Sequence, residues 1–386
     1  MVAVPDLSPV VQRSALTDLG PTNPFRLNAT DPGHDALAQQ AAKFIRAIGR
    51  VNIIVAGQTG VGKSTLINAV FGERFAKTAS GRPVTKEAQW FSSPSVPLRL
   101  LDTRGLEAKD YQLSLQEMRT EIEVCRKQSD AGDQLHMAWV CISASSNRIQ
   151  DCDVDVVRFL NRYEVPTLIV LTKYDEDPEM VDEVRSVMDE RRAQYIGVVP
   201  LRALPKPSRP AYGLEDLVQA TYSALPMAHR AAFAAAQQVS RDINRAAADE
   251  YISLASSTAA SAAVIPIPFA DVATLAPICA GMLIGISEAF GVTMARQQVM
   301  QLLSTVLGCV AMTLVGRWAV GSVLKFIPGP GSVVGAALNA GVAATVTRSL
   351  GKTYSEFLYK FIEQHRRVPS TDEVFDSFPE FFKKNR

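Results

Sequence analysis

Residues 57–65, which read GQTGVGKST, have the residue types and the spacing of a phosphate-binding loop. Its glycines permit a backbone turn whose successive N–H groups point inward at phosphate oxygens. Lys63 is expected to reach the β- and γ-phosphates of a nucleotide and to act in catalysis, and the Ser64 hydroxyl is expected to bind Mg²⁺. The nucleotide-binding positions predicted in this loop are Gly57, Thr59, Gly60, Val61, Gly62, Lys63, Ser64 and Thr65.

A chance glycine-rich turn is the alternative, and the flanking residues disfavour it. Residues 51–56 form a near-continuous apolar run that suits a buried parallel strand. Residues 66–71 have the apolar spacing of a helix. Strand, loop and helix in this order are the context that a phosphate-binding loop requires.

Two later positions have the chemistry of a nucleotide switch. Thr85 lies between the first helix and the next strand, where its hydroxyl would complete the Mg²⁺ shell and its N–H would contact the γ-phosphate. We therefore predict it as a metal ligand and a catalytic residue. Asp102 ends an apolar strand and is placed to hold Mg²⁺, while Gly105 lets the backbone approach the γ-phosphate.

The tetrapeptide TKYD at residues 172–175 follows another apolar run. The carboxylate of Asp175 can accept two hydrogen bonds from guanine, from N1–H and from the 2-amino group, whereas adenine offers neither donor. The Lys173 stem would lie along the purine ring, and Thr172 belongs to the same predicted site. After the next strand, the backbone N–H of Ala203 could bind the guanine O6. An ordinary turn at a strand end is the alternative.

The elements that must position these residues alternate between strands and helices across residues 50–225. This pattern predicts a doubly wound α/β domain whose ligand loops follow the carboxyl ends of the strands. Strands are expected over residues 51–56, 89–92, 97–101, 137–142, 167–171 and 196–200, and helices over 34–49, 66–71, 109–127, 179–195 and 213–225. In the helix over 109–127, the inward side chains are expected to be Leu113, Leu115, Met118, Ile122 and Cys125.

The motifs GQTGVGKS, Thr85, DTRG and TKYD, in this order, resemble those of Era-like and septin-like P-loop GTPases of the translation-factor-related branch, with some similarity to immunity-related GTPases. The resemblance covers residues 50–225 and implies a switch that binds GTP and GDP with Mg²⁺. Leu106 stands where the Ras type has a water-orienting glutamine, and Gly60 stands where Era-like members often have an asparagine linked to potassium activation. Arg202 replaces the usual serine before Ala203.

Composition limits the class of protein. The 386 residues carry 40 Lys and Arg against 39 Asp and Glu, so no global charge indicates a nucleic-acid partner. The length favours two domains, and the 47% hydrophobic content is enough for large cores. Five cysteines without metal-ligand spacing suggest a reduced, cytoplasmic protein. No signal peptide is expected, because the first residues lack a basic segment followed by an apolar run.

Residues 251–350 differ from the rest, because they carry only six charged side chains. Three apolar stretches, at residues 272–286, 302–324 and 333–346, are rich in Gly and Ala, which suits close helix packing in lipid or in a soluble bundle. Asp271, Glu288 and Arg317 argue against two clean membrane spans. We expect an interfacial or re-entrant helical hairpin, or spans packed around paired charges, with a soluble all-helical bundle as the alternative.

Residues 266–271 (PIPFAD) and 326–331 (FIPGPG) resemble the YcjF-type helical domain that often follows such GTPases, for which no catalytic residue is implied. The predicted organisation is a flexible arm at 1–32, a GTPase domain with a leading helix at 33–228, an all-α hydrophobic domain at 229–350, and a C-terminal helix and tail at 351–386. An Ala-rich helical arm is expected at residues 229–249. The phenylalanines after residue 351 are expected to make core or docking contacts.

The leading hypothesis is a cytoplasmic GTP-hydrolysing switch at the inner face of a membrane, whose helical domain couples nucleotide state to the membrane or to an effector protein. A GTP-binding scaffold with little hydrolysis is one alternative, and a self-assembling, homo-oligomeric membrane-remodelling GTPase is another. Because Leu106 cannot orient water, intrinsic hydrolysis is expected to be slow, with Arg82 and Arg104 as candidate arginine fingers.

Overall fold

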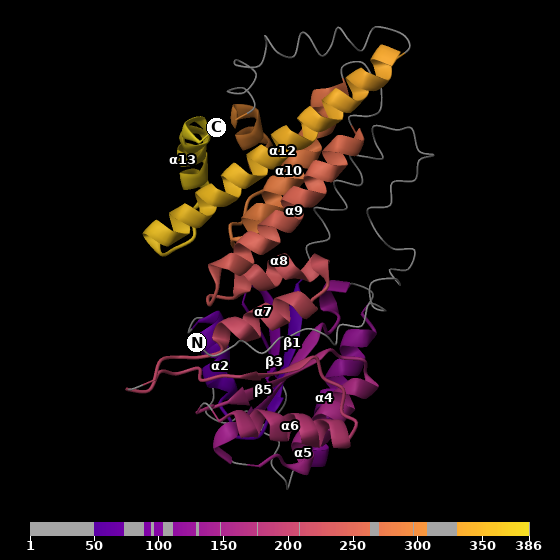
Figure 1. Cartoon of the computed structure of the whole chain (residues 1–386), viewed down its shortest axis with the longest axis vertical. Helices are drawn as coiled ribbons and strands as arrows, with labels where there is room; N and C mark the ends of the chain where they lie inside the picture. The colour runs from indigo at the N-terminus through magenta and orange to yellow at the C-terminus, as the bar shows by residue number, and fades with distance from the viewer. Residues whose placement is uncertain are drawn as a thin grey trace.

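The computed structural model (Figure 1) describes residues 50–72, 89–93, 96–102, 111–128, 131–146, 148–175, 177–207, 209–262, 270–295, 297–306 and 330–385. Several predicted features lie outside these residues. They are the N-terminal arm and the helix at 34–49, Arg82 and Thr85, residues 103–106 of the DTRG segment, and most of the apolar stretch 302–324.

A six-stranded sheet forms the centre of the N-terminal half, with the strand order β2-β3-β1-β4-β5-β6. β2 is antiparallel to β3, and every other neighbouring pair is parallel. Three central strands are buried along their whole length, which is why their sequences read as apolar runs. The α/β fold and all six predicted strands are confirmed: β1 (Val51–Gly57), β2 (Gln89–Ser93), β3 (Val96–Asp102), β4 (Met137–Ser143), β5 (Thr167–Thr172) and β6 (Gly197–Pro200).

Helices cover both faces of the sheet because successive strand residues point to opposite sides. Ile54 and Ala56 of β1 belong to one core, together with α4 (Tyr111–Arg126), α5 (Asp151–Arg162) and α6 (Pro178–Glu190). Ile53 and Val55 belong to the other core, together with α2 (Lys63–Phe71), α7 (Leu214–Ala224) and α8 (Met227–Ala236).

Two helices differ from the prediction in detail. α4 buries Ser114 with Met118, Ile122 and Cys125, whereas Leu113 is 48% exposed. The buried residues recur every three or four positions from Ser114, so Leu113 falls on the outer face. α6 ends at Glu190, five residues before the predicted end, because Arg192 adopts a left-handed conformation with φ 53°.

The expected helical arm at residues 229–249 is wrong in two respects. The segment contains the break between two helices, α8 and α9 (Arg241–Ala262), and α8 is part of the core. The Gln237 side chain makes the break, because its Oε1 accepts from the N–H groups of Val239 and Ser240 at 2.8 Å each. These donors therefore have a partner outside the helical pattern. Figure 1 shows α8 between the sheet and the long helices.

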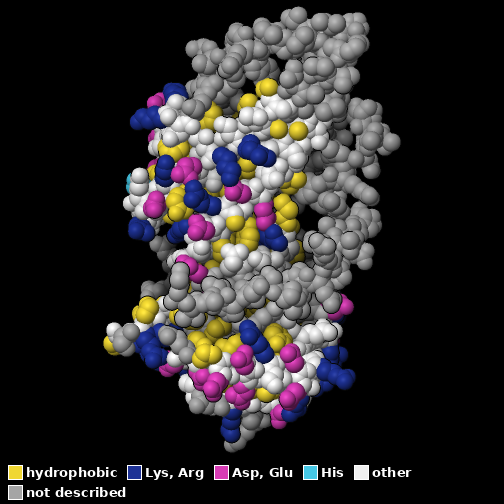
Figure 2. All heavy atoms as spheres, viewed as in Figure 1, with side chains coloured by type: hydrophobic (Ala, Val, Ile, Leu, Met, Phe, Trp, Pro, Cys, Tyr) yellow, Lys and Arg dark blue, Asp and Glu magenta, His cyan; other side chains and the backbone are white. Residues whose placement is uncertain are grey.

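The C-terminal half consists of helices, as predicted. α9, α10 (Ala270–Ala289) and α12 (Pro330–His365) pack along one another. Small residues permit this approach: a Cβ on Gly285 would lie 2.4 Å from the ring of Tyr251, and one on Gly351 would lie 2.6 Å from Ile252. None of the helices among the described residues combines the length and apolar character of a membrane span. Figure 2 shows charged side chains of both signs over this half as well as over the α/β half.

The last helix, α13 (Thr371–Lys384), packs on the end of α12 through aromatic side chains. Phe378 meets Tyr354 edge-on with ring centroids 4.8 Å apart, and it contacts Phe357 at 5.5 Å. Ser370 and Glu373 form a reciprocal capping box at the start of the helix. The C-terminal phenylalanines are thus core and docking contacts, as expected.

Candidate functional site

The loop between β1 and α2 turns on three glycines in left-handed conformations, with φ values of 142° at Gly57, 78° at Gly60 and 109° at Gly62. Side chains disfavour this region of backbone space. A side chain at Gly57 would also have no room, since a Cβ would lie 2.3 Å from the carbonyl oxygen of Cys141. Thr59 and Gly60 are exposed at the tip, and Val61 is buried. The loop has the turned backbone that phosphate binding requires.

Lys63 begins α2 and is held at the inner side of this loop. Its Nζ donates to the carbonyl oxygens of Gly57 at 2.8 Å and Gln58 at 3.0 Å. Ser64 follows in the exposed first turn, and Thr65 is half-buried. The start of α2 therefore combines an ammonium, a hydroxyl and the positive end of the helix dipole.

The TKYD segment lies directly against the phosphate-binding loop. The Thr172 hydroxyl is 2.6 Å from the carbonyl oxygen of Val61 and 3.1 Å from that of Ile142. Lys173, with φ 54°, donates from Nζ to the carbonyl oxygen of Gly60 at 2.6 Å. Two segments that are far apart in the chain are thus joined at the carboxyl ends of β1 and β5.

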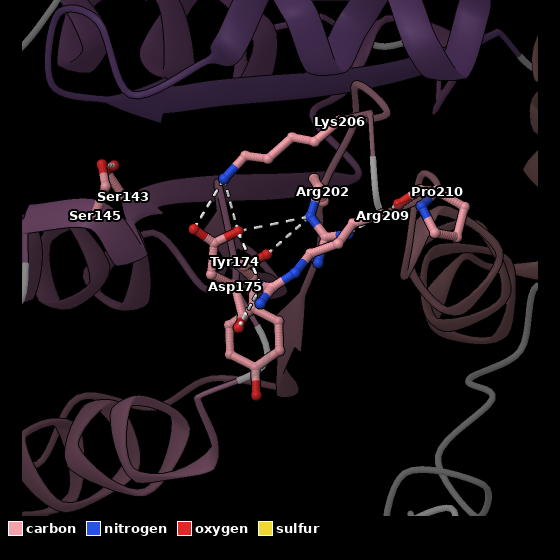
Figure 3. Close-up of polar contacts among 8 residues, drawn as sticks. All are labelled: Ser143, Ser145, Tyr174, Asp175, Arg202, Lys206, Arg209 and Pro210. Carbon is pink, nitrogen blue, oxygen red and sulfur yellow. Dashed lines mark hydrogen bonds and ion pairs between the residues drawn. The ribbon is translucent and has the colours of Figure 1, made fainter.

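Asp175 lies among three cationic side chains. The Nζ of Lys206 donates to both carboxylate oxygens, at 2.7 and 2.8 Å, and Arg209 and Arg202 come within 3.6 and 3.7 Å (Figure 3). The hydrogen bond from Lys206 and the neighbouring charges lower the pKa of Asp175 below its ordinary value. The carboxylate is consequently ionised at neutral pH.

The three cations come from one short hairpin, residues 202–207 and 209–212, which we call the base hairpin. Backbone bridges join Arg202 to Tyr212 and Lys206 to Arg209. The Arg202 side chain is 3% exposed, and its Nε donates to the carbonyl oxygen of Tyr174 at 3.2 Å. Ala203 follows Arg202 in the same hairpin and packs partly against the core. Arg202 is therefore a buried structural residue at the position where the resembling GTPases have serine.

A cavity of about 180 Å³, which no sequence pattern predicted, lies beside the phosphate-binding loop. Gln58 crosses to its far wall, where its Nε2 donates to Oδ1 of the buried Asp153 at 3.2 Å. Burial raises the pKa of Asp153. The spacing of Gln150 and Asp153, which form the capping box of α5, could have located the start of that helix but not its contact with Gln58. The lining residues include Gln58, Gly60, Ser143, Ser146, Gln150, Asp153 and Lys173.

Known families match both halves of the chain. Residues 52–173 match the 50S ribosome-binding GTPase family, and residues 228–378 match a domain of unknown function (DUF697). The N-terminal half is a P-loop GTPase domain. The GTPase resemblance inferred from the motifs and the YcjF-type resemblance of the helical half are both confirmed.

Individual relatives match about a third of the chain. GTPase Der of Brevibacillus brevis is 29% identical over 133 residues, which make up 33% of this chain and 28% of that protein. GTPase Der of Geotalea uraniireducens is 28% identical over 129 residues, with coverages of 33% and 28%. The chain therefore spans less than a third of the length of these relatives.

Solved structures of GTPases are also similar. Era in complex with MgGDPNP and nucleotides of 16S ribosomal RNA has a TM-score of 0.35 and 17% identity, covering 55% of this chain and 68% of that one. A probable GTP-binding protein engB has a TM-score of 0.34 and 20% identity, with coverages of 45% and 98%.

Two of the predicted Mg²⁺ ligands belong to segments that meet the phosphate-binding loop. Ser64 lies in the first turn of α2, and Asp102 ends β3 opposite Val55, two residues before the loop. Hydroxyl and carboxylate oxygens are the ligands that Mg²⁺ prefers, so these residues fit the ion. The predicted roles of Thr85 and Gly105 fall outside the described residues and stay predictions.

Proposed function

We propose that this protein is a GTP-binding and GTP-hydrolysing switch whose helical half couples nucleotide state to a membrane or a protein partner. One observation carries the nucleotide part of the proposal. The contacts of Thr172 with Val61 and of Lys173 with Gly60 hold the TKYD segment against the phosphate-binding loop. A base-recognising carboxylate and a phosphate site therefore lie at the same edge of the sheet, as one nucleotide requires.

Base selection would rest on Asp175. The two oxygens of its ionised carboxylate match the N1–H and 2-amino donors of guanine, and adenine would leave them without partners. Lys173 is anchored on the loop by Gly60, which places its stem between the base side and the phosphate side of the site. GTP and GDP are accordingly the proposed ligands.

Hydrolysis would rely on positioning and charge. The Lys63 ammonium, held by Gly57 and Gln58, and the N–H groups of the loop would stabilise negative charge on the β- and γ-phosphates. Mg²⁺, when bound, supplies further neutralisation of the phosphate charge, and Ser64, Asp102 and Thr85 are the residues that would hold it. Leu106 supplies no polar group to orient water, which supports a slow intrinsic rate.

Coupling to the helical half is supported by the contacts of α2. The N–H of Gln238, at the start of the break between α8 and α9, donates to the carbonyl oxygen of Val70 at 2.8 Å. Phe71 stacks on Trp139 with centroids 5.8 Å apart and meets Phe233 of α8 edge-on at 6.2 Å. The helix that begins at the phosphate site thus ends against the helical half.

The cellular partner is proposed from composition. The low charge of residues 251–350 supports docking on the cytoplasmic face of a membrane, with an effector protein or a second copy of the chain as the other possible partners. A scaffold would bind GTP with little turnover, whereas a remodelling GTPase would turn over faster at higher protein concentration on lipid.

Multiple-turnover GTP hydrolysis by the full chain, with and without liposomes, tests these proposals. We expect slow hydrolysis in the wild type and none in Lys63→Ala. Lys127→Met is the matched control, because Lys127 follows α4 at the opposite end of the sheet from the loop. Binding without turnover would indicate the scaffold.

Equal binding of GTP and ATP would contradict the proposal. Flotation of the chain with liposomes would distinguish a membrane partner from a protein partner.

A further inference from the structure

Lys206 and a guanine base would compete for the same two oxygens. We propose that the base hairpin is a built-in competitor of the nucleotide: the Lys206 ammonium occupies the Asp175 carboxylate, lowers the affinity for guanine nucleotides and speeds their release. This inference rests on the proposed function, and it concerns how that same site is regulated.

The competition follows from hydrogen-bond geometry. Lys206 donates to Oδ1 at 2.7 Å and to Oδ2 at 2.8 Å. Guanine would use the same oxygens to accept from its N1–H and its 2-amino group. Both the ammonium and the base would make charge-assisted bonds to this carboxylate, so the base must displace a favourable contact before it can bind.

Lys206 is held beside the Asp175 carboxylate by backbone hydrogen bonds within the hairpin. Two pairs of backbone hydrogen bonds close it, between Arg202 and Tyr212 at 2.9 and 3.0 Å and between Lys206 and Arg209 at 2.8 and 3.0 Å. Pro207 disfavours the helical region for Lys206, the residue before it, and Pro205 has a fixed φ of its own on the other side of the lysine.

The base hairpin also contacts the TKYD segment directly. The buried Arg202 donates from Nε to the carbonyl oxygen of Tyr174 at 3.2 Å, and Arg209 donates to the carbonyl oxygen of Asp175 at 3.0 Å. The rings of Tyr174 and Tyr212 stack with centroids 6.1 Å apart. Figure 3 shows the three cationic side chains converging on Asp175 from this one hairpin. Lys206 is thus positioned by a hairpin that also contacts the TKYD segment, which contains Asp175.

The expected effect is moderate, because the pair is exposed. The side chains of Lys206 and Asp175 are 51% and 52% exposed, so water screens their attraction and solvates the released ammonium. Removal of the ammonium should therefore tighten GDP binding by about 2- to 5-fold. If Lys206 instead turned to the O6 of the bound base, its removal would weaken binding.

Equilibrium and stopped-flow binding of a fluorescent GDP analogue to the full chain tests this. Lys206→Met is compared with the wild type and with Lys127→Met, which removes an exposed lysine at the far end of the sheet. We expect a lower Kd and slower release for Lys206→Met, with the gain shrinking as salt rises, and no change for Lys127→Met. Weaker or equal binding by Lys206→Met would overturn the inference and leave the proposed function standing.

Hydrogen exchange in protein freed of nucleotide gives a second readout. The amides of Lys206 and Arg209 should exchange faster in Lys206→Met than in the wild type, because the hairpin loses the hydrogen bonds from the Lys206 side chain to Asp175. If neither protein binds GDP, the proposed function is wrong and this inference fails with it. Binding by Lys206→Met alone would be the strongest support.

Discussion

The backbone N–H of Gln238 donates to the carbonyl oxygen of Val70, 2.8 Å away, and so joins the last turn of α2 to the break between α8 and α9. The last carbonyls of a helix have no partner within it, so this bond satisfies one of them from another part of the fold. Gly72 leaves α2 with φ 83°, where a Cβ would lie 2.7 Å from the Gln238 side chain. The end of the phosphate-loop helix is therefore shaped by the helical half.

The first prediction concerns the core that the two halves share. Phe233 of α8 is fully buried and meets Phe71 edge-on, so Phe233→Ala should lower the free energy of unfolding by about 3–5 kcal/mol. Urea unfolding followed by tryptophan fluorescence measures this. Phe381→Ala, at a half-buried position on α13, serves as the comparison, and its free energy of unfolding should fall clearly less. A loss below about 1 kcal/mol for Phe233→Ala would show that α8 is not a core element.

The second prediction compares two glycines in long helices. In Gly285→Ala the new Cβ would lie 2.4 Å from the Tyr251 ring, which should lower the free energy of unfolding by about 1–3 kcal/mol. In Gly341→Ala the Cβ meets nothing within 4 Å, and the better helix propensity should raise stability by about 0.5–1 kcal/mol. Thermal and urea unfolding of the two variants should therefore move in opposite directions. Equal behaviour would argue against close packing of α9 and α10.

The third prediction tests base recognition. Asp175→Asn should weaken GTP binding by about 100-fold or more and should favour xanthosine triphosphate, because the amide can donate to the 2-oxo group of xanthine. Competition binding with GTP, XTP and ATP measures the change. Asp177→Asn is the matched control, since Asp177 caps α6 and asparagine caps a helix equally well. Unchanged GTP preference in Asp175→Asn would remove this residue from the base site.

The fourth prediction concerns pH. Burial raises the pKa of Glu288 on α10 to about 7 from its ordinary value of 4.5, and its Oε2 is buried without a hydrogen bond within the described part of the chain. The folded protein therefore holds the proton more tightly than the unfolded chain does. As pH rises from about 4.5 to 7, the folded state must either keep the proton or bury a charge, so this group progressively reduces stability.

Glu288→Gln removes that dependence. The variant should match the wild type near pH 4 and exceed its free energy of unfolding by on the order of 1–3 kcal/mol near pH 8. Urea unfolding of both proteins across this range gives the difference directly. A difference that is constant with pH would show that Glu288 titrates normally.

Much of the GTPase domain could be predicted because its information is local. A buried parallel strand such as β1 needs a contiguous apolar run, and a phosphate-binding loop needs glycines at fixed offsets from Lys63. Both properties depend on residues within one short segment. The contact of α8 with the sheet was missed because its Ala-rich pattern is compatible with an exposed arm as well as with a tight core position.

The sequence by itself determined the six strands, the phosphate-binding loop and the placement of the TKYD segment at the end of β5, since periodicity and spacing encode each of them. Only the tertiary structure decided what surrounds these residues: Gln58 reaching Asp153, Gln238 meeting Val70, and Lys206 donating to both oxygens of Asp175. Each of these contacts joins segments between 31 and 168 positions apart, as the pairs 58–153, 70–238 and 175–206 show. Such pairings depend on how the strands and helices pack together, and no local pattern records that packing.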